Sequence, residues 1–276
     1  MSLKLSNLLT IRAYNQTNYM KLQNKELLPI EHRYIVGMRI DATNYIDATN
    51  QIVTWAKHKV GKRVCAANVH MAMETYDNPK FAEIVNQADL VTPDGMPLVW
   101  GLRALGIKNA NRVCGPYLTL SVCEAAAQEK LPIALYGGTE QSLVDFTNFL
   151  VEKYPGIKIA CRISPPFRAL TPDEDTVYTA QIVASGAQIL FVGIGCPRQE
   201  IWMAEHQDRI SAVMLGVGAA FNFHSGHVKH APQWMQIVGL EWLFRLIMEP
   251  RRLWKRYFRQ NPRFIFLFLK QLLRRC

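Results

Sequence analysis

Apolar and polar positions along the chain switch repeatedly between two periods, and this switching predicts an α/β fold. Short apolar stretches typical of buried strands occur at 34–40, 63–69, 88–95, 131–138, 157–163, 187–195 and 212–221. Between them, apolar residues recur at helical spacing in 44–59, 70–87, 96–106, 116–130, 139–154, 171–186 and 197–209. Strands that alternate with helices form a parallel sheet covered on both faces, so we predict that architecture.

The same pattern divides the chain into three parts. Residues 1–33 are polar and weakly periodic, and we expect an N-terminal extension. Residues 34–233 hold the alternating strands and helices and form the predicted α/β core. Residues 234–276 show helical spacing throughout, and we expect an amphipathic helical appendage.

Charge changes the interpretation of this appendage. Ten Lys/Arg and one acid lie between Arg245 and Cys276, which gives +9 of the chain's net +10. The segment is also rich in Trp, Tyr, Phe and Leu, a composition that suits the headgroup layer of an anionic membrane. The apolar run 264–269 is far shorter than the roughly 20 residues of a spanning helix, so we expect the protein to lie on the membrane surface. A nucleic acid is the alternative anionic partner, but the core carries no nucleic-acid-binding motif, and we expect no nucleic acid.

Cysteine usage bears on the compartment. Six cysteines are widely spaced, and none forms a C-x-x-C pair, which disfavours a zinc site and a disulfide framework. The first 19 residues lack the apolar core of a signal peptide. Reduced thiols in the cytoplasm are therefore expected.

Polar residues follow two of the predicted strands. Ligands bind beyond the carboxyl ends of strands in open parallel sheets. Asn68 lies near the end of the predicted strand 63–69 and is either a ligand to a sugar or a helix cap. Asp94 lies at the end of the next predicted strand, in the turn Thr92–Pro97, and it is either a general base for a substrate hydroxyl or an N-cap.

Glycines follow two further strands. Gly137 and Gly138 end one, and Gly193 and Gly195 end another, before the predicted helix 197–209, whose first turn holds Gln199. The free N–H groups of a helix N-terminus suit a diphosphate, although ordinary strand-to-helix capping remains the alternative. The segment is not a dinucleotide fingerprint because an arginine stands at the third glycine position.

Two segments invite a metal interpretation that we set aside. His224, His227 and His230 are spaced by three, but no carboxylate or fourth ligand lies between them. Asp173 and Asp175 form a literal D-x-D, but they follow Thr-Pro, which favours a helix N-terminus. We expect no metal and no other cofactor.

The ordered motifs resemble the WecG/TagA/CpsF family of bacterial glycosyltransferases. The matching stretches run in order from about residue 34 to 260 and include AANVHM, ADLVTPDGMPLVW, RVCGPYL, FVGIGCPRQEIWM, GVGAAFNFHSGHVKHAPQWMQ and GLEWLFRLIMEPRRLWKRY. The resemblance implies a Rossmann-like sheet with a membrane-directed appendage. It also implies inverting transfer of a sugar from a UDP donor to an undecaprenyl-diphosphate-linked acceptor for cell-surface polysaccharide synthesis, at the inner face of the cell membrane.

The resemblance also implies residue roles. Asp94 is the expected general base, and Arg112 is expected beside the acceptor or leaving group. Substrate-binding positions are expected at Asn68, Gly137, Gly138, Gly193, Gly195, Gln199 and Asn222. Contacts to the acceptor diphosphate or the membrane are expected from Arg245, Arg252 and Arg256.

One residue departs from the family pattern. Some members carry a threonine where this chain has Ala66, which has no side-chain hydrogen-bonding group, so donor choice or acceptor placement can differ. N-acetylmannosamine transfer to a GlcNAc-diphospholipid is the expected reaction. Glucosyl transfer for an exopolysaccharide, or a uronic-acid donor, stays open. Self-association is a further expectation because an undocked apolar tail needs cover.

Overall fold

The computed structural model describes residues 30–226 and 228–274, so nearly all of the predicted extension 1–33 lies outside the described residues. Its centre is a parallel sheet of six strands in the order β4-β3-β8-β7-β5-β6, which confirms the predicted α/β class. The strands are β3 (Lys62–Ala67), β4 (Leu90–Pro93), β5 (Pro132–Gly137), β6 (Lys158–Ile163), β7 (Ile189–Gly193) and β8 (Val213–Gly216).

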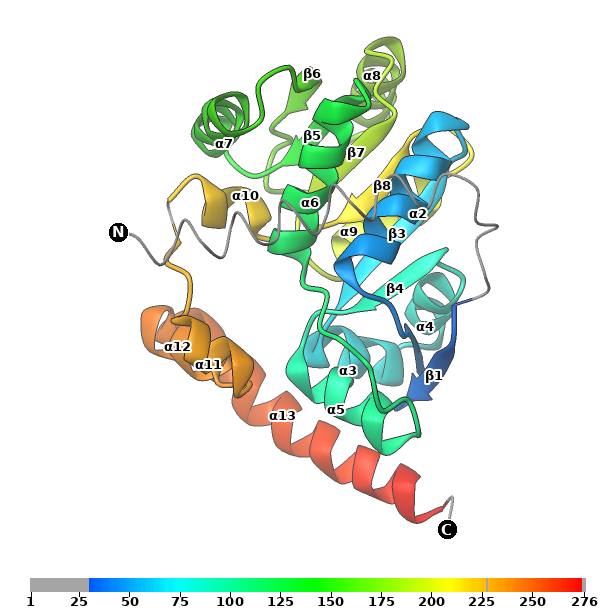
Figure 1. Ribbon diagram of the computed structural model, residues 1–276, viewed down its shortest axis with the longest axis vertical. Helices are drawn as coiled ribbons and strands as arrows, with labels where there is room; N and C mark the ends of the chain where they lie inside the picture. Colours follow the sequence, from blue (N-terminus) through cyan, green and yellow to red (C-terminus); the bar gives the residue numbers. More distant parts are fainter. Residues whose placement is uncertain (1–29, 227, 275–276) are drawn as a thin grey trace. The chain divides into compact units, whose positions relative to one another are not determined.

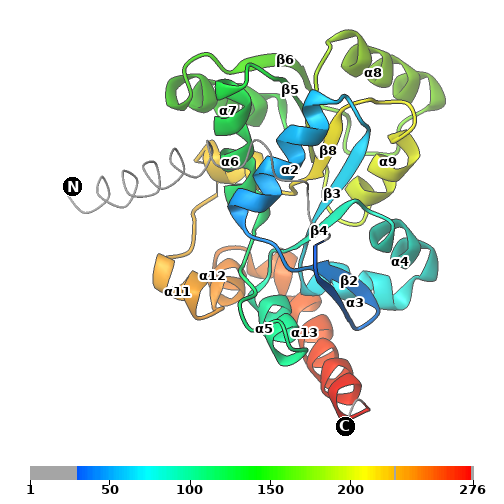
Figure 2. The same ribbon diagram turned by 45° about the vertical axis from the view of Figure 1, so that its right-hand side comes forward.

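Helices cover both faces of the sheet (Figures 1 and 2). One face carries α2 (Tyr45–Lys57), α6 (Gly115–Gln128) and α7 (Glu140–Lys153), and the other carries α4 (Pro79–Asn86), α8 (Pro172–Ala184) and α9 (Arg198–His206). Every pair of neighbouring strands in this sheet is parallel. All the carboxyl ends of the strands therefore point to one edge of the sheet.

The apolar stretch at 34–40, predicted as one strand, is a β-hairpin outside the main sheet. Strand β1 (His32–Ile35) pairs antiparallel with β2 (Met38–Asp41). Val36 and Gly37 have φ values of 52° and 84°, the two positive values that a two-residue type I′ turn requires. The prediction was wrong because the turn is hidden within an otherwise apolar run.

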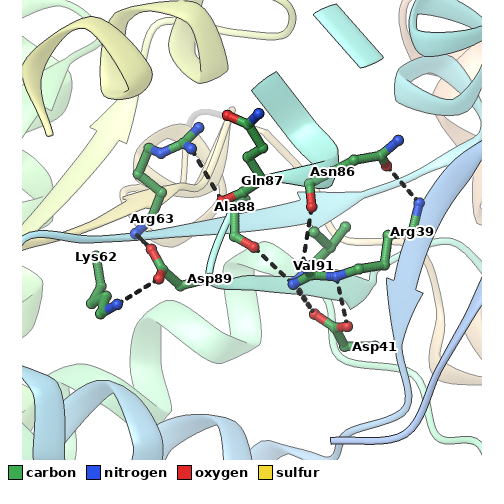
Figure 3. A network of polar contacts seen from close by, with 9 residues as sticks. All are labelled: Arg39, Asp41, Lys62, Arg63, Asn86, Gln87, Ala88, Asp89 and Val91. Atoms are coloured by element: carbon green, nitrogen blue, oxygen red, sulfur yellow. Dashed lines mark hydrogen bonds and ion pairs between the residues drawn. The ribbon is translucent and has the colours of Figure 1, made fainter. Parts of the chain in front are cut away.

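A polar network fastens this hairpin to the start of β4 (Figure 3). Arg39 donates to both carboxylate oxygens of Asp41 at 3.0 and 2.9 Å, and Asp41 Oδ2 also accepts the N–H of Val91 at 2.7 Å. Asp89 joins Lys62 and the backbone N–H of Arg63, each at 2.8 Å. The amino end of β4 is thereby held on both sides.

Capping side chains fix several helix starts. Asn44 caps α2, and Thr139 forms a capping box with Ser142 at α7. Thr171 forms a second capping box with Glu174 at α8. Because Asp173–Asp175 occupy the first turn of α8, the capping interpretation of the D-x-D sequence is confirmed.

The stretch 212–221 is a strand only in its first half. Strand β8 ends at Gly216, and α10 (Ala220–His224) begins four residues later. Gly218 has a φ of 58°, a backbone conformation that reverses the chain and that favours glycine. The small residues that follow the strand therefore form a turn into a helix.

The end of the chain forms three helices, α11 (Gln233–Ile237), α12 (Glu241–Met248) and α13 (Pro250–Leu273). In both ribbon views α13 runs beside α3 (Val69–Asp77) and α5 (Met96–Ala104). Its Leu253 and Phe264 are buried. Gln271 exchanges hydrogen bonds with Val36 N–H and Tyr34 C=O of the hairpin. The predicted helical appendage is thus present and is packed along the core.

No helix within the described ranges is long and apolar enough to cross a bilayer.

Candidate functional site

The carboxyl ends of β3 and β4 bring two predicted site residues together. Ala67 and Pro93 are register partners, so the residues that follow them, Asn68 and Asp94, leave the sheet side by side. The backbone N–H of Asp94 donates to the carbonyl of Ala67 at 2.8 Å, and the N–H of Gly95 donates to the same carbonyl at 3.3 Å. Asp94 is thereby held at the strand end by backbone bonds, and Gly95, not Asp94, is the N-cap residue of α5.

Arg112 lies directly against Asp94. The loop that carries Arg112 is fastened to β4, because Val113 N–H donates to Pro93 C=O at 3.0 Å and Thr92 Oγ1 donates to Val113 C=O at 3.0 Å. Arg112 Nε donates to the backbone carbonyl of Asp94, and its Nη2 lies 3.4 Å from Asp94 Oδ1. The sequence resemblance placed these two residues in one site, and the fold brings them into contact.

A second carboxylate reaches the same guanidinium from the appendage. Arg112 Nη2 donates to Glu241 Oε2 of α12 at 2.6 Å. The side chains of Asp94, Arg112 and Glu241 are 22%, 18% and 28% exposed. We call this arrangement the Asp94–Arg112–Glu241 chain. Sequence reasoning missed Glu241, and the only available sign was its place in the matching stretch GLEWLFRL.

Burial raises the pKa of the Asp94 carboxyl to about 6. The charges of Arg112 and Arg245 lower this pKa, and the charge of Glu241 raises it further. A carboxylate whose pKa lies near the working pH is ionised at neutrality and still basic enough to accept a proton in a transition state. Asp94 therefore has the position and the acidity of a general base.

Tyr45 is a further neighbour that the sequence did not reveal. Cys114 N–H donates to the Tyr45 hydroxyl at 3.1 Å, and the hydroxyl lies 3.3 Å from Cys114 Sγ. Burial raises the pKa of the Cys114 thiol to about 12 and raises that of Tyr45 as well. Both groups are therefore neutral at pH 7, and the thiol is unsuited to act as a nucleophile.

The predicted glycines lie at the ends of β5 and β7, on the other side of β8 from Asp94. A Cβ added to Gly137 would stand 2.6 Å from the Gly193 backbone, and one added to Gly193 would stand 2.7 Å from the Phe221 ring. These two glycines allow neighbouring chain segments to approach closely. Gly138 (φ 72°) packs toward Ser142, whereas Gly195 (φ 84°) faces open space.

Gln199 is buried and joins two loops at this edge. Its Oε1 accepts the N–H groups of Gly195 at 3.2 Å and Gly218 at 3.1 Å, while its Nε2 donates to Glu200 at 2.7 Å. Burial raises the pKa of Glu200 to about 7. In this structure Gln199 therefore shapes the glycine loops through its hydrogen bonds.

A small hollow opens beside these loops, between the ends of β5, β6 and β7. Its lining residues are Gly138, Pro165, Pro166, Phe167, Gly193, Ile194 and Arg198. The ring of Phe167 is 75% exposed at its rim. The hollow therefore brings an exposed aromatic ring and the side chain of Arg198 to the carboxyl ends of these strands.

Asn68 and Asn222 occupy helical positions near the strand ends. Asn68 is the N-cap of α3, and its Oδ1 accepts the N–H of Met71 at 3.2 Å. The capping interpretation of Asn68 is therefore confirmed, and its role toward a ligand remains a prediction. Asn222 is half-buried on α10.

His224 is part of an aromatic cluster. Its ring stacks against Phe146 and Phe149, and its Nε2 lies 2.8 Å from the carbonyl of Pro116. Burial lowers the pKa of His224 to about 4, so this ring is neutral at pH 7. His227 lies outside the described residues, and within them no group of three metal-type ligands is found.

Two of the three predicted appendage arginines face the core. The guanidinium of Arg245 lies 5.3 Å from the Phe223 ring centre, and its charge acts on Asp94. Arg256 acts electrostatically on His70 of α3. In the part of the chain that is described, the buried Nε atoms of both arginines have no hydrogen-bond partner. Arg252, by contrast, is exposed and paired with Glu249.

Comparison with known proteins gives one family and several relatives. The family described as "Glycosyl transferase WecG/TagA/CpsF family" matches residues 33–276. A protein of Bacillus spizizenii strain W23 is 28% identical over 218 residues, covering 79% of this chain and 82% of the relative. One of Bacillus subtilis strain 168 is 27% identical over 230 residues, covering 83% and 86%. Both are named N-acetylglucosaminyldiphosphoundecaprenol N-acetyl-beta-D-mannosaminyltransferase.

Proposed function

Because this chain belongs to the WecG/TagA/CpsF family of glycosyltransferases, we propose that it transfers N-acetylmannosamine from a UDP donor to an N-acetylglucosaminyl-diphosphoundecaprenol acceptor. Asp94 is the general base of this proposal. The observation that carries it is the aspartate at the end of β4, with a pKa near neutrality and an arginine beside it. The two named relatives support the choice of sugars.

The proposed reaction is a single displacement with inversion. The acceptor hydroxyl loses its proton to Asp94 as its oxygen forms a bond to the anomeric carbon of the donor. The bond from that carbon to the UDP oxygen breaks, and the electron pair leaves with UDP. One suitably placed base contributes about 10²–10⁴-fold to the rate of such a step.

The leaving diphosphate needs positive charge and N–H donors, which this edge of the sheet supplies. Arg112 stands at the reacting centre, and the N-terminus of α9, which no side chain caps, follows Gly195 closely and carries the positive end of the helix dipole. The unpartnered Nε atoms of Arg245 and Arg256 offer donors to the acceptor diphosphate. We propose that Arg252 joins them once it exchanges Glu249 for a phosphate oxygen.

We propose that Asn68 and Asn222 bind the hexose. Gln199 holds the loops that contain Gly195 and Gly218. Ala66 lies 3.4 Å from the position of a Cβ at Gly115, in the layer below the strand ends. The methyl group offers the sugar no hydrogen bond. A donor that places a polar substituent there would therefore bind less well than one that does not.

The appendage is proposed to hold the enzyme on an anionic membrane at its cytoplasmic face. The exposed apolar side chains Trp254, Phe258, Ile265 and Leu269 recur at helical spacing along one exposed flank of α13, beside the buried side that carries Phe264. Exposed basic residues stand along the same helix at Arg251, Lys255, Arg259, Lys270 and Arg274. This pairing of apolar and basic side chains is the composition of a helix that lies in the headgroup layer.

Turnover on vesicles tests the reaction. Full-length protein is mixed with anionic vesicles, and UDP-ManNAc (made in place from UDP-GlcNAc by an epimerase), UDP-ManNAcA and UDP-glucose are each crossed with short-chain GlcNAc- and glucose-diphospholipids. We expect ManNAc transfer to the GlcNAc acceptor, and Asp94→Asn should lower its rate about 10²–10⁴-fold. Transfer from UDP-glucose alone would replace the proposed sugars, and equal turnover by Asp94→Asn would remove the proposed base.

Sedimentation with vesicles tests the membrane proposal separately. We expect binding to vesicles that contain anionic lipid, weaker binding to zwitterionic ones, and loss of binding when Trp254 and Phe258 are both replaced by serine. The matched control is Val177→Ser together with Val183→Ser, which removes exposed apolar side chains from α8 of the core. Equal binding by wild type and the α13 variant would contradict the assignment of this face.

A further inference from the structure

The Asp94–Arg112–Glu241 chain places two carboxylates on one guanidinium, and they are not bound equally. Glu241 Oε2 lies 2.6 Å from Arg112 Nη2, while Asp94 Oδ1 lies 3.4 Å from the same nitrogen. The shorter contact is thus made by the acid that comes from the appendage. Arg112 is held mainly by Glu241 and by the backbone carbonyl of Asp94, rather than by the Asp94 carboxylate.

A different ion pair of the protein, Arg168 with Glu174, shows how an arginine that bonds both oxygens of a carboxylate changes the pKa of that acid. Arg168 donates through both Nη atoms to the two oxygens of Glu174, each at 2.6 Å. These hydrogen bonds lower the pKa of Glu174 to about 2. A carboxylate held in that way is a weak base, and both of its oxygens are occupied. Asp94 would approach the same condition if Arg112 turned fully toward it.

The position of Glu241 depends on how α12 packs against the core. Gly239 has a φ of 75°, and a Cβ added there would stand 2.7 Å from the Trp100 ring of α5. The chain turns at this glycine, and α12 begins two residues later with Glu241 in its first turn. The carboxylate therefore reaches Arg112 only while this segment lies against α5.

We propose that Glu241 is a positioning residue for the base: it holds the Arg112 guanidinium on the appendage side and so leaves the Asp94 carboxylate free to accept the acceptor proton. The role rests on the proposed function of Asp94. It also makes the strength of the base depend on the packing of α12, so that an enzyme whose appendage is displaced carries a weaker base.

The charged and titratable groups around Asp94 all indicate that its pKa falls when the charge of Glu241 is removed. Arg112, from the loop before α6, and Arg245, from α12, stabilise its charged form, and Glu241 opposes them. Tyr45 of α2 and Cys114 at the start of α6 are neutral at pH 7 because burial raises their pKa values. Loss of the Glu241 charge therefore leaves two cations unopposed, and the pKa of Asp94 falls.

The test is Glu241→Gln, which keeps the shape and a hydrogen-bond acceptor for Arg112 but removes the charge. The pKa of Asp94 is followed by carbon NMR of ¹³C-labelled aspartate carboxyls, with the Asp94 signal assigned from Asp94→Asn. We expect the pKa to fall by about one unit. The control, Glu249→Gln, removes a carboxylate from the same appendage that is paired with Arg252 instead, and it should leave the Asp94 pKa in place.

The same variants are then compared by rate. We expect Glu241→Gln to move the acid limb of the kcat/KM profile by the same amount to lower pH and to lower kcat on the plateau, because a weaker base accepts the proton less readily. An unchanged Asp94 pKa would overturn the proposal. So would a lower KM for the UDP donor with an unchanged profile, because Glu241 would then merely compete with substrate for Arg112.

The NMR result does not depend on turnover. A wild-type enzyme that transfers no sugar, but whose Asp94 pKa responds to Glu241→Gln, would reject the proposed reaction and keep the proposed link between the two acids.

Discussion

An aspartate–arginine pair lies beside each end of strand β4, and the two pairs have opposite character. Near the amino end, Asp41 receives both donors of Arg39 and the N–H of Val91 (Figure 3). At the carboxyl end, Asp94 Oδ1 has one distant contact with Arg112, at 3.4 Å, because that arginine is shared with Glu241.

The difference lies in how completely each carboxylate is satisfied. Arg39 also donates to the carbonyls of Asn86 and Ala88, so its pair with Asp41 ties three chain segments together. A buried pair of this kind is costly to break, since removing one partner leaves the other charge buried. An acid that is buried but incompletely bonded keeps a raised pKa and remains reactive. We infer that the first pair stabilises the fold and that the second performs chemistry.

The largest expected effect comes from removing the base. Asp94→Asn should lower kcat about 10²–10⁴-fold.

The raised pKa of Asp94 means that the folded state binds the Asp94 proton more tightly than the unfolded state does. The stability that this group contributes is therefore lost as pH rises from about 4 to 6.

The same substitution should therefore stabilise the fold at pH 8, by about 1–3 kcal/mol. Urea unfolding of wild type and Asp94→Asn at pH 8 and pH 4 measures this difference. A variant that loses activity together with stability at pH 8 would contradict the contrast between the two pairs.

The opposite result is expected at the other end of β4. Asp41→Asn should reduce the free energy of unfolding by about 3 kcal/mol, because Arg39 keeps its charge while the amide nitrogen faces its donors. Turnover per folded molecule should not change. Urea unfolding measures the loss of stability, and initial rates of the same preparation measure turnover per folded molecule. A lower kcat with an unchanged free energy of unfolding would place Asp41 in the functional site.

The pH dependence of the wild type gives a smaller effect. Since Asp94 must be ionised to accept a proton and its pKa is about 6, kcat/KM should fall nearly tenfold for each unit below pH 6 and level off above pH 7. Initial rates between pH 4.5 and 8.5 measure the limb. A midpoint near the ordinary pKa of an aspartate would show that burial does not tune this acid.

The smallest effect concerns a third aspartate–arginine pair. Asp77 of α3 and Arg263 of α13 form a bidentate contact, but both side chains are exposed, at 43% and 36%. Solvent-exposed pairs contribute little because water and salt screen them. Asp77→Asn should leave the urea midpoint and the pH profile of turnover unchanged. A clearly lower urea midpoint or a shifted pH profile would show that this pair holds α13 in place.

Much of the arrangement around β4 could be predicted from the sequence. The apolar stretches at 88–95 and 63–69 predicted two parallel strands, and Asp94 and Asn68 lie near their carboxyl ends, so a shared edge of the sheet was expected. The hairpin at 32–41 was missed because its turn, Val36–Gly37, interrupts the apolar pattern by only one residue. The start of α10 was missed because small apolar residues fit a strand and a turn equally well.

The sequence by itself determined the α/β class, the basic helical end of the chain and the strand ends that carry Asp94 and the glycines, because periodicity and turn residues act over a few neighbouring positions. The tertiary structure alone decided that Glu241 meets Arg112 across 129 positions, that Gln199 bonds two loops, and that Asp94 is buried enough to be a base. Those properties depend on which distant side chains the packing brings together and on how much water it excludes. A pattern of neighbouring residues in the sequence predicts neither of these.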